Sequence, residues 1–158
     1  FIILGIVILI AVVFGIMMRK DIAKGISTLE SKLSMSFQGQ VDEVQAHVVT
    51  CLNEGLEQAV FNSNLGLAAT SEIDYEESVA RFVKGKAVEC IDGFSQFDKL
   101  TITKNSPMTV KVDYRKTFIT ADASMQLEIS EGDSRATLTD FTSTLDLKVP
   151  AYGVSTSA

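Results

Sequence analysis

The stretch FIILGIVILIAVVFGIMM, residues 1–18, contains no charged residue, no proline and no polar side chain, and a basic pair, Arg19 and Lys20, follows it directly. Fifteen of its residues are large and apolar, and the others are glycine or alanine. As a helix it would be about 27 Å long, enough to cross most of the hydrocarbon core of a bilayer. We therefore predict an apolar helix over residues 1–20 that lies in a membrane or among copies of itself.

The apolar stretch continues into an amphipathic pattern. Between residues 21 and 61, apolar side chains recur every three or four positions, as one face of a helix requires; they are Ile22, Ile26, Leu29, Leu33, Phe37, Val41, Val44, Val48, Leu52, Leu56 and Val60. No proline interrupts the segment, so we predict one helix from residue 1 to about residue 61, roughly 90 Å long. A coiled-coil stalk is the rival interpretation, but the spacing drifts from strict heptads.

A loop and a second helix are predicted next. Asparagine, serine and glycine over residues 62–66 indicate a stop, with a loop to about residue 71, and a helix fits residues 72–92 before Gly93. The apolar face of this helix consists of Tyr75, Val79, Phe82, Val83, Ala87, Ile91 and Phe94. Four acidic residues crowd its first turns, where they favour the helix dipole. We interpret them as a solvated helix end and not as catalytic carboxylates.

The last part of the chain has the period of β-strands. Apolar and polar residues alternate from Phe97 onward, with turn signals between the runs. We predict strands over residues 98–103, 108–114, 118–130 and 135–149, separated by turns at residues 104–107, 115–117 and 130–133. A change of phase between Leu138 and Phe141 predicts a β-bulge. The expected fold class is therefore α+β, with a four-stranded antiparallel sheet packed on the helix pair, and residues 62–158 form an outer globular domain.

The chain has two cysteines, Cys51 and Cys90, on the apolar sides of the two predicted helices. Helices joined by a short loop pack antiparallel, which brings both thiols onto facing sides. In an exported chain such a pair is more often a disulfide than a redox or metal site. A bridge would close a loop of about 40 residues, worth roughly 4 kcal/mol in the chain-entropy model. Two separate buried thiols are the alternative.

Neither the composition nor the sequence motifs indicate an enzyme, a metal site or a nucleic-acid-binding protein. The 158 residues carry a net charge of −6, and no basic stripe exists to neutralise phosphates, so we predict no nucleic-acid partner. His47 is the only histidine, and we expect no second metal ligand beside it. Glu131 and Asp133 could hold calcium, but a hairpin turn explains them better. Because phosphate-binding loops, metalloprotease motifs and nucleophile elbows are all lacking, we predict no enzyme activity, no cofactor and no metal.

An apolar stretch that begins at Phe1, with no basic flank before it, resembles the type IV pilin superfamily, in which a leader is cut off just before the apolar segment. The resemblance covers residues 1–20 and extends loosely to the long helix. Gly5 stands where bacterial major pilins usually have glutamate, and Ile22 stands where many have a kinking proline. Lack of that glutamate is common among archaeal members, so the resemblance points to an archaeal pilin-like subunit.

The resemblance implies a homo-oligomeric helical filament on the cell surface, built from membrane-inserted precursors. Its implied partners are a prepilin peptidase, a membrane platform protein and a cytoplasmic assembly ATPase. The residues expected in the filament core are Phe1, Ile3, Gly5, Val7, Ile10, Phe14 and Met17. The alternative is a monomeric, membrane-anchored, extracytoplasmic binding domain.

Overall fold

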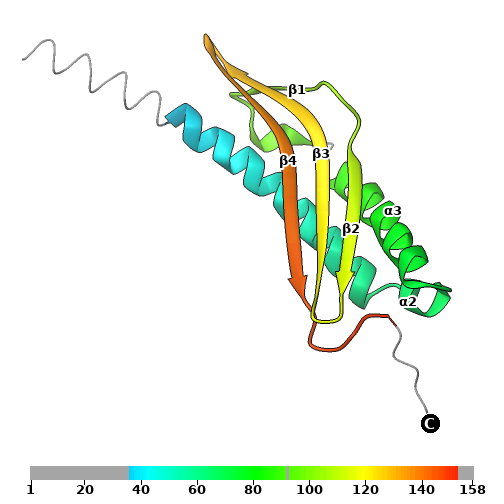
Figure 1. Cartoon of the computed structure of the whole chain (residues 1–158). Helices are drawn as coiled ribbons and strands as arrows, with labels where there is room; N and C mark the ends of the chain where they lie inside the picture. Colours follow the sequence, from blue (N-terminus) through cyan, green and yellow to red (C-terminus); the bar gives the residue numbers. More distant parts are fainter. Residues whose placement is uncertain (1–35, 92, 153–158) are drawn as a thin grey trace, which may run out of the picture. The chain divides into compact units, whose positions relative to one another are not determined.

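The computed structural model describes residues 36–91 and 93–152 (Figure 1). The chain divides into two compact units, residues 1–40 and residues 41–158, and the second is described here by itself. The predicted apolar helix over residues 1–20, and the first part of its amphipathic continuation, lie outside the described residues. Among the helices that the structure does describe, none is both long and apolar enough to cross a membrane.

The first described helix runs over residues 36–61, and α3 spans Glu72–Ile91. On the first helix, the buried side chains fall three or four residues apart, except that Cys51 and Leu52 are neighbours: Val41, Val44, Val48, Cys51, Leu52, Leu56 and Ala59. On α3 they are Tyr75, Val79, Val83, Ala87 and Ile91, all on the predicted apolar face. The helices pack closely at Gly55, where an added Cβ would lie 3.4 Å from backbone atoms of Val83. The pair is antiparallel, as predicted.

The sheet is built around one long strand, β3 (Phe118–Glu131). Strand β4 (Ser134–Asp146) pairs with β3 along its whole length, antiparallel. The other edge of β3 is shared by two strands placed end to end, β2 (Thr109–Arg115) and β1 (Thr101–Lys104). All pairings are antiparallel, so the predicted four-stranded antiparallel sheet and the α+β class are confirmed.

The connection from β1 to β2 corrects the prediction of a reversing turn at residues 104–107. The chain continues in the same direction there, because both strands pair with β3 in the same sense. Two hydrogen bonds hold the connection to β3: the Asn105 N–H donates to the Gln126 carbonyl at 2.8 Å, and the Gln126 N–H donates to Ser106 Oγ at 2.8 Å. Asn105 and Ser106 thus supply hydrogen bonds to β3 in the gap between β1 and β2, where the regular pairing is interrupted.

The two predicted hairpins are confirmed. Strands β2 and β3 form a tight hairpin, in which Arg115 pairs with Phe118. Strands β3 and β4 form a second hairpin around Gly132, which has a φ of 59° and occupies the first central position of the loop. Glycine adopts that left-handed conformation without steric cost. The bulge predicted in the last strand is found at the expected level, opposite Leu138 to Asp140, but the extra residue lies in β3, between Ser124 and Leu127.

Three segment boundaries differ from the predictions. The loop predicted over residues 62–71 contains a short helix, α2 (Leu65–Ala68). Strand β1 starts three residues later than predicted, because a 3₁₀ turn, η1 (Phe94–Gln96), precedes it. Strand β4 ends at Asp146 and not at residue 149; the next N–H, of Leu147, donates to the Thr117 carbonyl at 2.8 Å. Residues 147–152 then leave the sheet.

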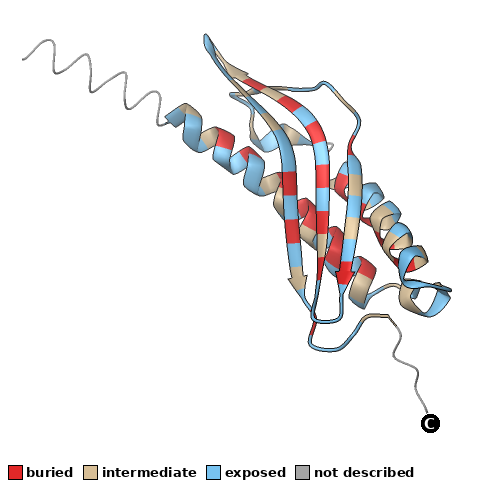
Figure 2. Ribbon diagram, viewed as in Figure 1, coloured by how far each residue is buried: buried red, intermediate tan, exposed pale blue. Residues whose placement is uncertain are grey.

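Burial separates the two faces of the sheet (Figure 2). The odd-numbered residues of β3 from Ile119 to Ile129 are all buried towards the helices, whereas its even-numbered residues are exposed or half-buried. Ser143 of β4 is the only buried polar residue among those described, and its Oγ donates to Asn53 Oδ1 of the first helix at 3.1 Å. The core therefore lies between one face of the sheet and the helix pair.

Candidate functional site

The seven residues predicted for the filament core, from Phe1 to Met17, lie outside the described residues. The other predicted site is present: Cys51 and Cys90 form a disulfide, with their Cα atoms 5.7 Å apart. The bond joins the middle of the first helix to the last turn of α3. Cys51 is only 1% exposed, whereas Cys90 lies nearer the surface. The disulfide therefore runs from the core towards the surface of the helix pair.

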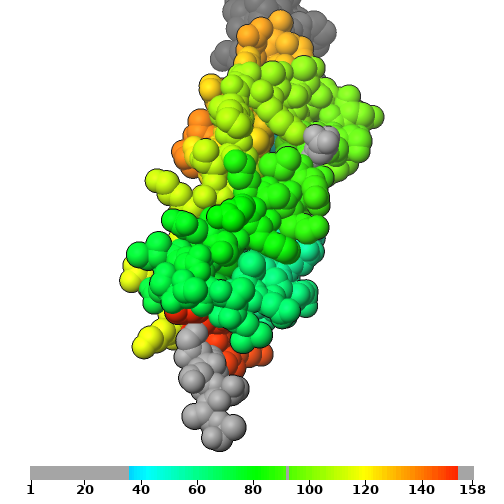
Figure 3. Space-filling view, turned by 90° about the vertical axis from the view of Figure 1, so that its right-hand side faces the viewer, coloured from blue at the N-terminus to red at the C-terminus, as the bar shows by residue number. Residues whose placement is uncertain are grey.

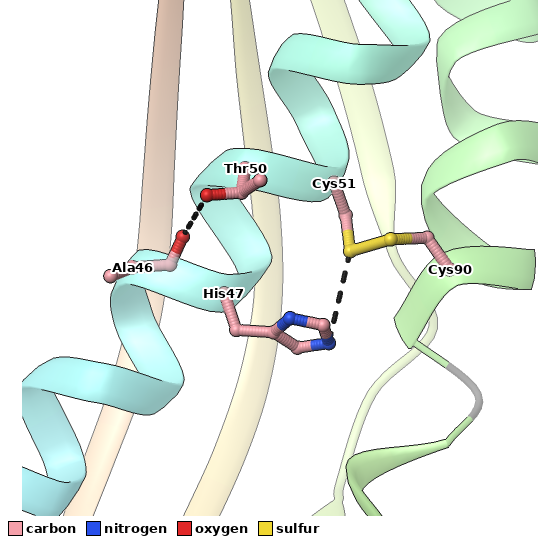
Figure 4. Close-up of a disulfide and its surroundings, with 5 residues drawn as sticks. All are labelled: Ala46, His47, Thr50, Cys51 and Cys90. Atoms are coloured by element: carbon pink, nitrogen blue, oxygen red, sulfur yellow. Dashed lines mark hydrogen bonds between the residues drawn. A yellow bond between two sulfur atoms is a disulfide. The ribbon is translucent and has the colours of Figure 1, made fainter. Parts of the chain in front are cut away.

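The prediction that His47 has no potential ligand beside it is wrong. Its Nε2 lies 3.8 Å from Cys51 Sγ, and Figure 4 shows the imidazole directed towards the disulfide. Cys51 is four residues after His47, so both side chains project from the same face of the helix. This spacing was the sequence signal for the contact.

Two phenylalanines complete the surroundings of His47. The rings of Phe94 and Phe97, from the 3₁₀ turn after α3, lie edge-on to the imidazole at centroid distances of 6.0 and 5.9 Å. The ammonium of Lys104 lies 5.8 Å from the centre of the Phe94 ring, within the range of a cation–π contact. These contacts anchor the turn and the start of the sheet to the helix that carries Cys51.

Among the histidine, cysteine and acidic side chains in the described part of the chain, one group has ligand atoms that converge. It consists of His47, Cys51 and Cys90. The ligand atoms of His47, Cys51 and Cys90 lie within 4.8 Å of one another. Thiolates bind metals, but here both sulfurs belong to the disulfide. The arrangement therefore acts as a covalent link between two helices, with the imidazole packed against it.

The opposite end of α3 is held by a tyrosine cluster: Tyr75, Tyr114 and Tyr152, which are all the tyrosines of the chain. Tyr75 stacks on Tyr152 at 5.6 Å and meets Tyr114 edge-on at 5.4 Å. The Tyr114 hydroxyl lies 3.3 Å from both the N–H and the carbonyl of Tyr152. Burial, and then the neighbouring Tyr114, raise the pKa of Tyr75 to about 12.

The segment that ends in Tyr152 approaches α2 closely. A Cβ added at Gly66 would overlap the carbonyl oxygen of Ala151 and touch the ring of Tyr75. Gly66 is therefore required for close packing, although its backbone conformation is ordinary for a helix. Nothing in the spacing of the tyrosines, at positions 75, 114 and 152, indicated that the cluster would form.

The acidic first turns of α3 have structural partners in this region. The Thr70 N–H donates to Asp74 at 2.8 Å, and the Tyr114 N–H, on the outer edge of β2, donates to Glu76 at 2.7 Å. The first contact stabilises the helix start and the second satisfies an edge-strand donor. Glu72 and Glu77 take part in no ion pair within the described residues.

A surface cavity of about 450 Å³ lies between α3 and the β1–β2 connection. Its apolar lining includes Val88, Ile91, Met108 and Met125, and two lysines, Lys84 and Lys104, flank it. Ile91 and the two methionines are almost fully buried, whereas Val88 is 44% exposed. The lining is therefore largely apolar, and the charge of the side chains that flank it is positive.

Known protein families, curated proteins and solved structures were all compared with the chain, and none of them matches it.

Proposed function

We propose that this protein is a structural subunit of an extracellular, type IV pilus-like filament, assembled by packing of its N-terminal apolar segments. The observation that carries the proposal is the uncharged stretch of residues 1–18, followed by forty residues of amphipathic helical pattern. A long apolar segment that leads into an amphipathic one suits a subunit that moves from a membrane into the core of a polymer. We propose an archaeal origin on the resemblance alone.

The energetics of the apolar segment support such a transfer. Removing its fifteen large apolar side chains from water is worth, as an upper bound, roughly 20 to 45 kcal/mol. A free subunit would therefore remain in the membrane. Lipid and a bundle of apolar helices are similarly apolar, so moving the segment from one to the other is nearly neutral. Assembly then needs a machine to extract the subunit, which is the role proposed for a platform protein and an ATPase.

The described unit suits the outer part of such a filament. Its first helix carries a buried stripe on which α3 and the sheet pack, and a disulfide joins it to α3. Disulfides persist in oxidising surroundings such as the cell exterior. The proposal therefore gives residues 41–152 the role of a cross-linked surface domain.

The test is a charge placed in the apolar stretch. Val7→Asp would leave an unpaired carboxylate among apolar helices, at a cost of several kcal/mol, whereas Val7→Leu keeps the site apolar. We expect filaments in sheared surface fractions, viewed by negative-stain microscopy, from the wild type and Val7→Leu but not from Val7→Asp. Immunoblots of the membrane fraction would show that the subunit is still made. Normal filaments from Val7→Asp would contradict the proposal.

The cavity beside α3 favours a second candidate, a monomeric, membrane-anchored, extracytoplasmic binding domain. Its volume of about 450 Å³ is within the range of small-molecule sites. The two candidates differ in what shearing releases from the cell surface. A binding domain gives only monomers that stay with the membrane, whereas a filament subunit gives polymers that sediment.

A further inference from the structure

Figure 3 shows the face of the molecule on which α3 lies, with α3 in green, the C-terminal segment at the lower end in red and the residues before β2 in lime. The two ends of α3 differ in the side chains that surround them. At the start of α3, Ile73 is 69% exposed, and Leu67 of α2 is 87% exposed. The acidic residues of the first turn, Glu72 and Asp74, lie beside Ile73. We call Leu67, Ile73 and these two carboxylates the acidic knob.

The other half of α3 carries the reverse combination. Lys84, Val88 and Ile91 line the 450 Å³ cavity, and Met108 and Met125 provide further apolar lining. Lys84 is exposed and takes part in no ion pair within the described residues, and Lys104 contributes a second positive charge at the cavity. The lysines that flank the apolar cavity are opposite in charge to the carboxylates beside the exposed Ile73.

We propose that the acidic knob of one copy docks into the lysine-flanked cavity of the next copy. A cavity facing a second cavity would bring lysines together, and a knob facing a knob would bring carboxylates together, so the charges favour contacts of a knob with a cavity. Knob and cavity lie at different places on one subunit, so a contact repeated along the proposed filament is heterologous and leaves a free knob at one end and a free cavity at the other. Such contacts propagate into open helical assemblies when the rotation between copies does not close a ring.

This contact rests on the proposed function and deepens it, because it supplies a lateral interaction between outer domains. The chain itself is the partner with the right chemistry. The chain carries a net charge of −6, and two of its lysines flank the cavity. Val88 and Ile73 are both exposed in the single subunit, and the contact would remove their side chains from water.

The experiment places cysteines on the full-length chain in cells that assemble it. Under oxidation, Ile73→Cys/Val88→Cys should give a ladder of covalent dimers, trimers and higher species on non-reducing gels. Either single variant alone should give none, and a mixture of the two should give only dimers. Ile73→Cys/Thr142→Cys, which moves the second thiol to the exposed face of the sheet, is the matched control and should give no ladder. All three positions are exposed, so the substitutions should leave the fold intact.

The outcomes separate this inference from the proposed function. Wild-type filaments without a ladder from the double variant would overturn the contact and leave the filament intact. Dimers from a single-cysteine variant would also overturn it, because they place knob against knob or cavity against cavity. Dimers without a ladder from the double variant would overturn the propagating contact, because they indicate a reciprocal two-fold interface. A ladder without filaments would support the contact and contradict the filament.

A charge swap gives a second measurement that introduces no thiol. Lys84→Glu should lower filament yield by about fivefold at low salt, the size expected for an exposed charge pair. Glu72→Lys combined with Lys84→Glu should restore the yield. Lys86→Glu is the matched control and should leave it unchanged, because Lys86 pairs with Glu89 outside the cavity. Failure of the swap to restore the yield would count against the contact.

Discussion

The two ends of α3 are fastened by different means. Near its C-terminus, a covalent bond from Cys90 to Cys51 fixes α3 to the first helix, with His47 packed against the sulfurs. Near its N-terminus, Tyr75 packs against Tyr114 of β2 and Tyr152 of the final segment, with no covalent link. The disulfide end stays joined even where its packing is imperfect. The tyrosine end can separate and re-form, because it depends on close contacts alone.

This comparison indicates where the unit yields first. The tyrosine end brings together α3, an edge strand and a segment that has already left the sheet. Local opening starts in regions whose order depends on a few contacts. Small changes at the tyrosine end should therefore lower stability without disturbing the disulfide end.

The largest expected effect comes from removing the covalent link. Cys51→Ala/Cys90→Ala opens a loop whose ends are 39 residues apart in sequence, which should lower the free energy of unfolding by about 4 kcal/mol in the chain-entropy model. Urea denaturation monitored by circular dichroism measures the change. Wild type treated with a reductant is the control and should fall by a similar amount. A loss below about 1 kcal/mol would show that packing alone holds this end.

The next effect tests the packing at the tyrosine end. Gly66→Ala should destabilise the protein by about 2 kcal/mol, because the new methyl group overlaps the Ala151 carbonyl. Gly85→Ala is the matched control in α3: its methyl group meets nothing within 4 Å, and alanine favours a helix interior by about 1 kcal/mol. Opposite signs for the two changes in the urea midpoint are expected. Equal signs would mean that the final segment does not pack on α2.

Alkaline pH tests the same end through Tyr75. Its pKa is about 12 in the folded protein and near 10 in the unfolded chain, so as pH rises the unfolded chain loses the proton first. Stability that is fully present below pH 10 is therefore lost between pH 10 and 12. From pH 9 to pH 11 the wild type should lose about 1 kcal/mol more than Tyr75→Phe. If urea titrations show that both proteins lose the same stability over this pH range, the phenol of Tyr75 is solvated in the folded protein.

The smallest effect concerns the edge of β2. Glu76→Gln replaces the carboxylate that accepts the Tyr114 N–H with a neutral amide, which should cost about 0.5 kcal/mol. Glu77→Gln, one residue on, removes the same charge from an exposed side chain without that bond and should be neutral. Urea midpoints, together with hydrogen exchange of the Tyr114 amide, measure the difference. Equal exchange rates in the two variants would mean that Glu76 does not protect the edge.

The parts of the fold that follow from local periodicity were predictable. Apolar spacing of three or four placed the helix pair, alternation placed the strands, and the phase change near Leu138 indicated the bulge. The disulfide followed from the positions of two cysteines on facing helices. In each case the signal lies within a few residues of the feature that it determines.

The remaining features depend on contacts between distant segments. The turn signal over residues 104–107 is real, but whether the chain reverses there is decided by hydrogen bonds to Gln126 of β3. The tyrosine cluster likewise unites three separate elements, and the need for Gly66 arises only from the approach of Ala151. His47 differs, because its i, i+4 relation to Cys51 was visible in the sequence. The predicted filament core lies outside the described residues, so those residues stay predictions.

The bond between Cys51 and Cys90 also determines how the unit responds to pulling. Tension applied between residues 41 and 152 passes through the sulfur atoms and bypasses the intervening residues, 52–89. Fully stretched, that bypassed segment would add about 130 Å of contour length. While the bond is intact, α3 carries no load from end to end, and the subunit can lengthen only through residues 41–51 and 90–152. The disulfide therefore limits extensibility, so that an overstretched subunit keeps a compact, load-free loop from which it can refold.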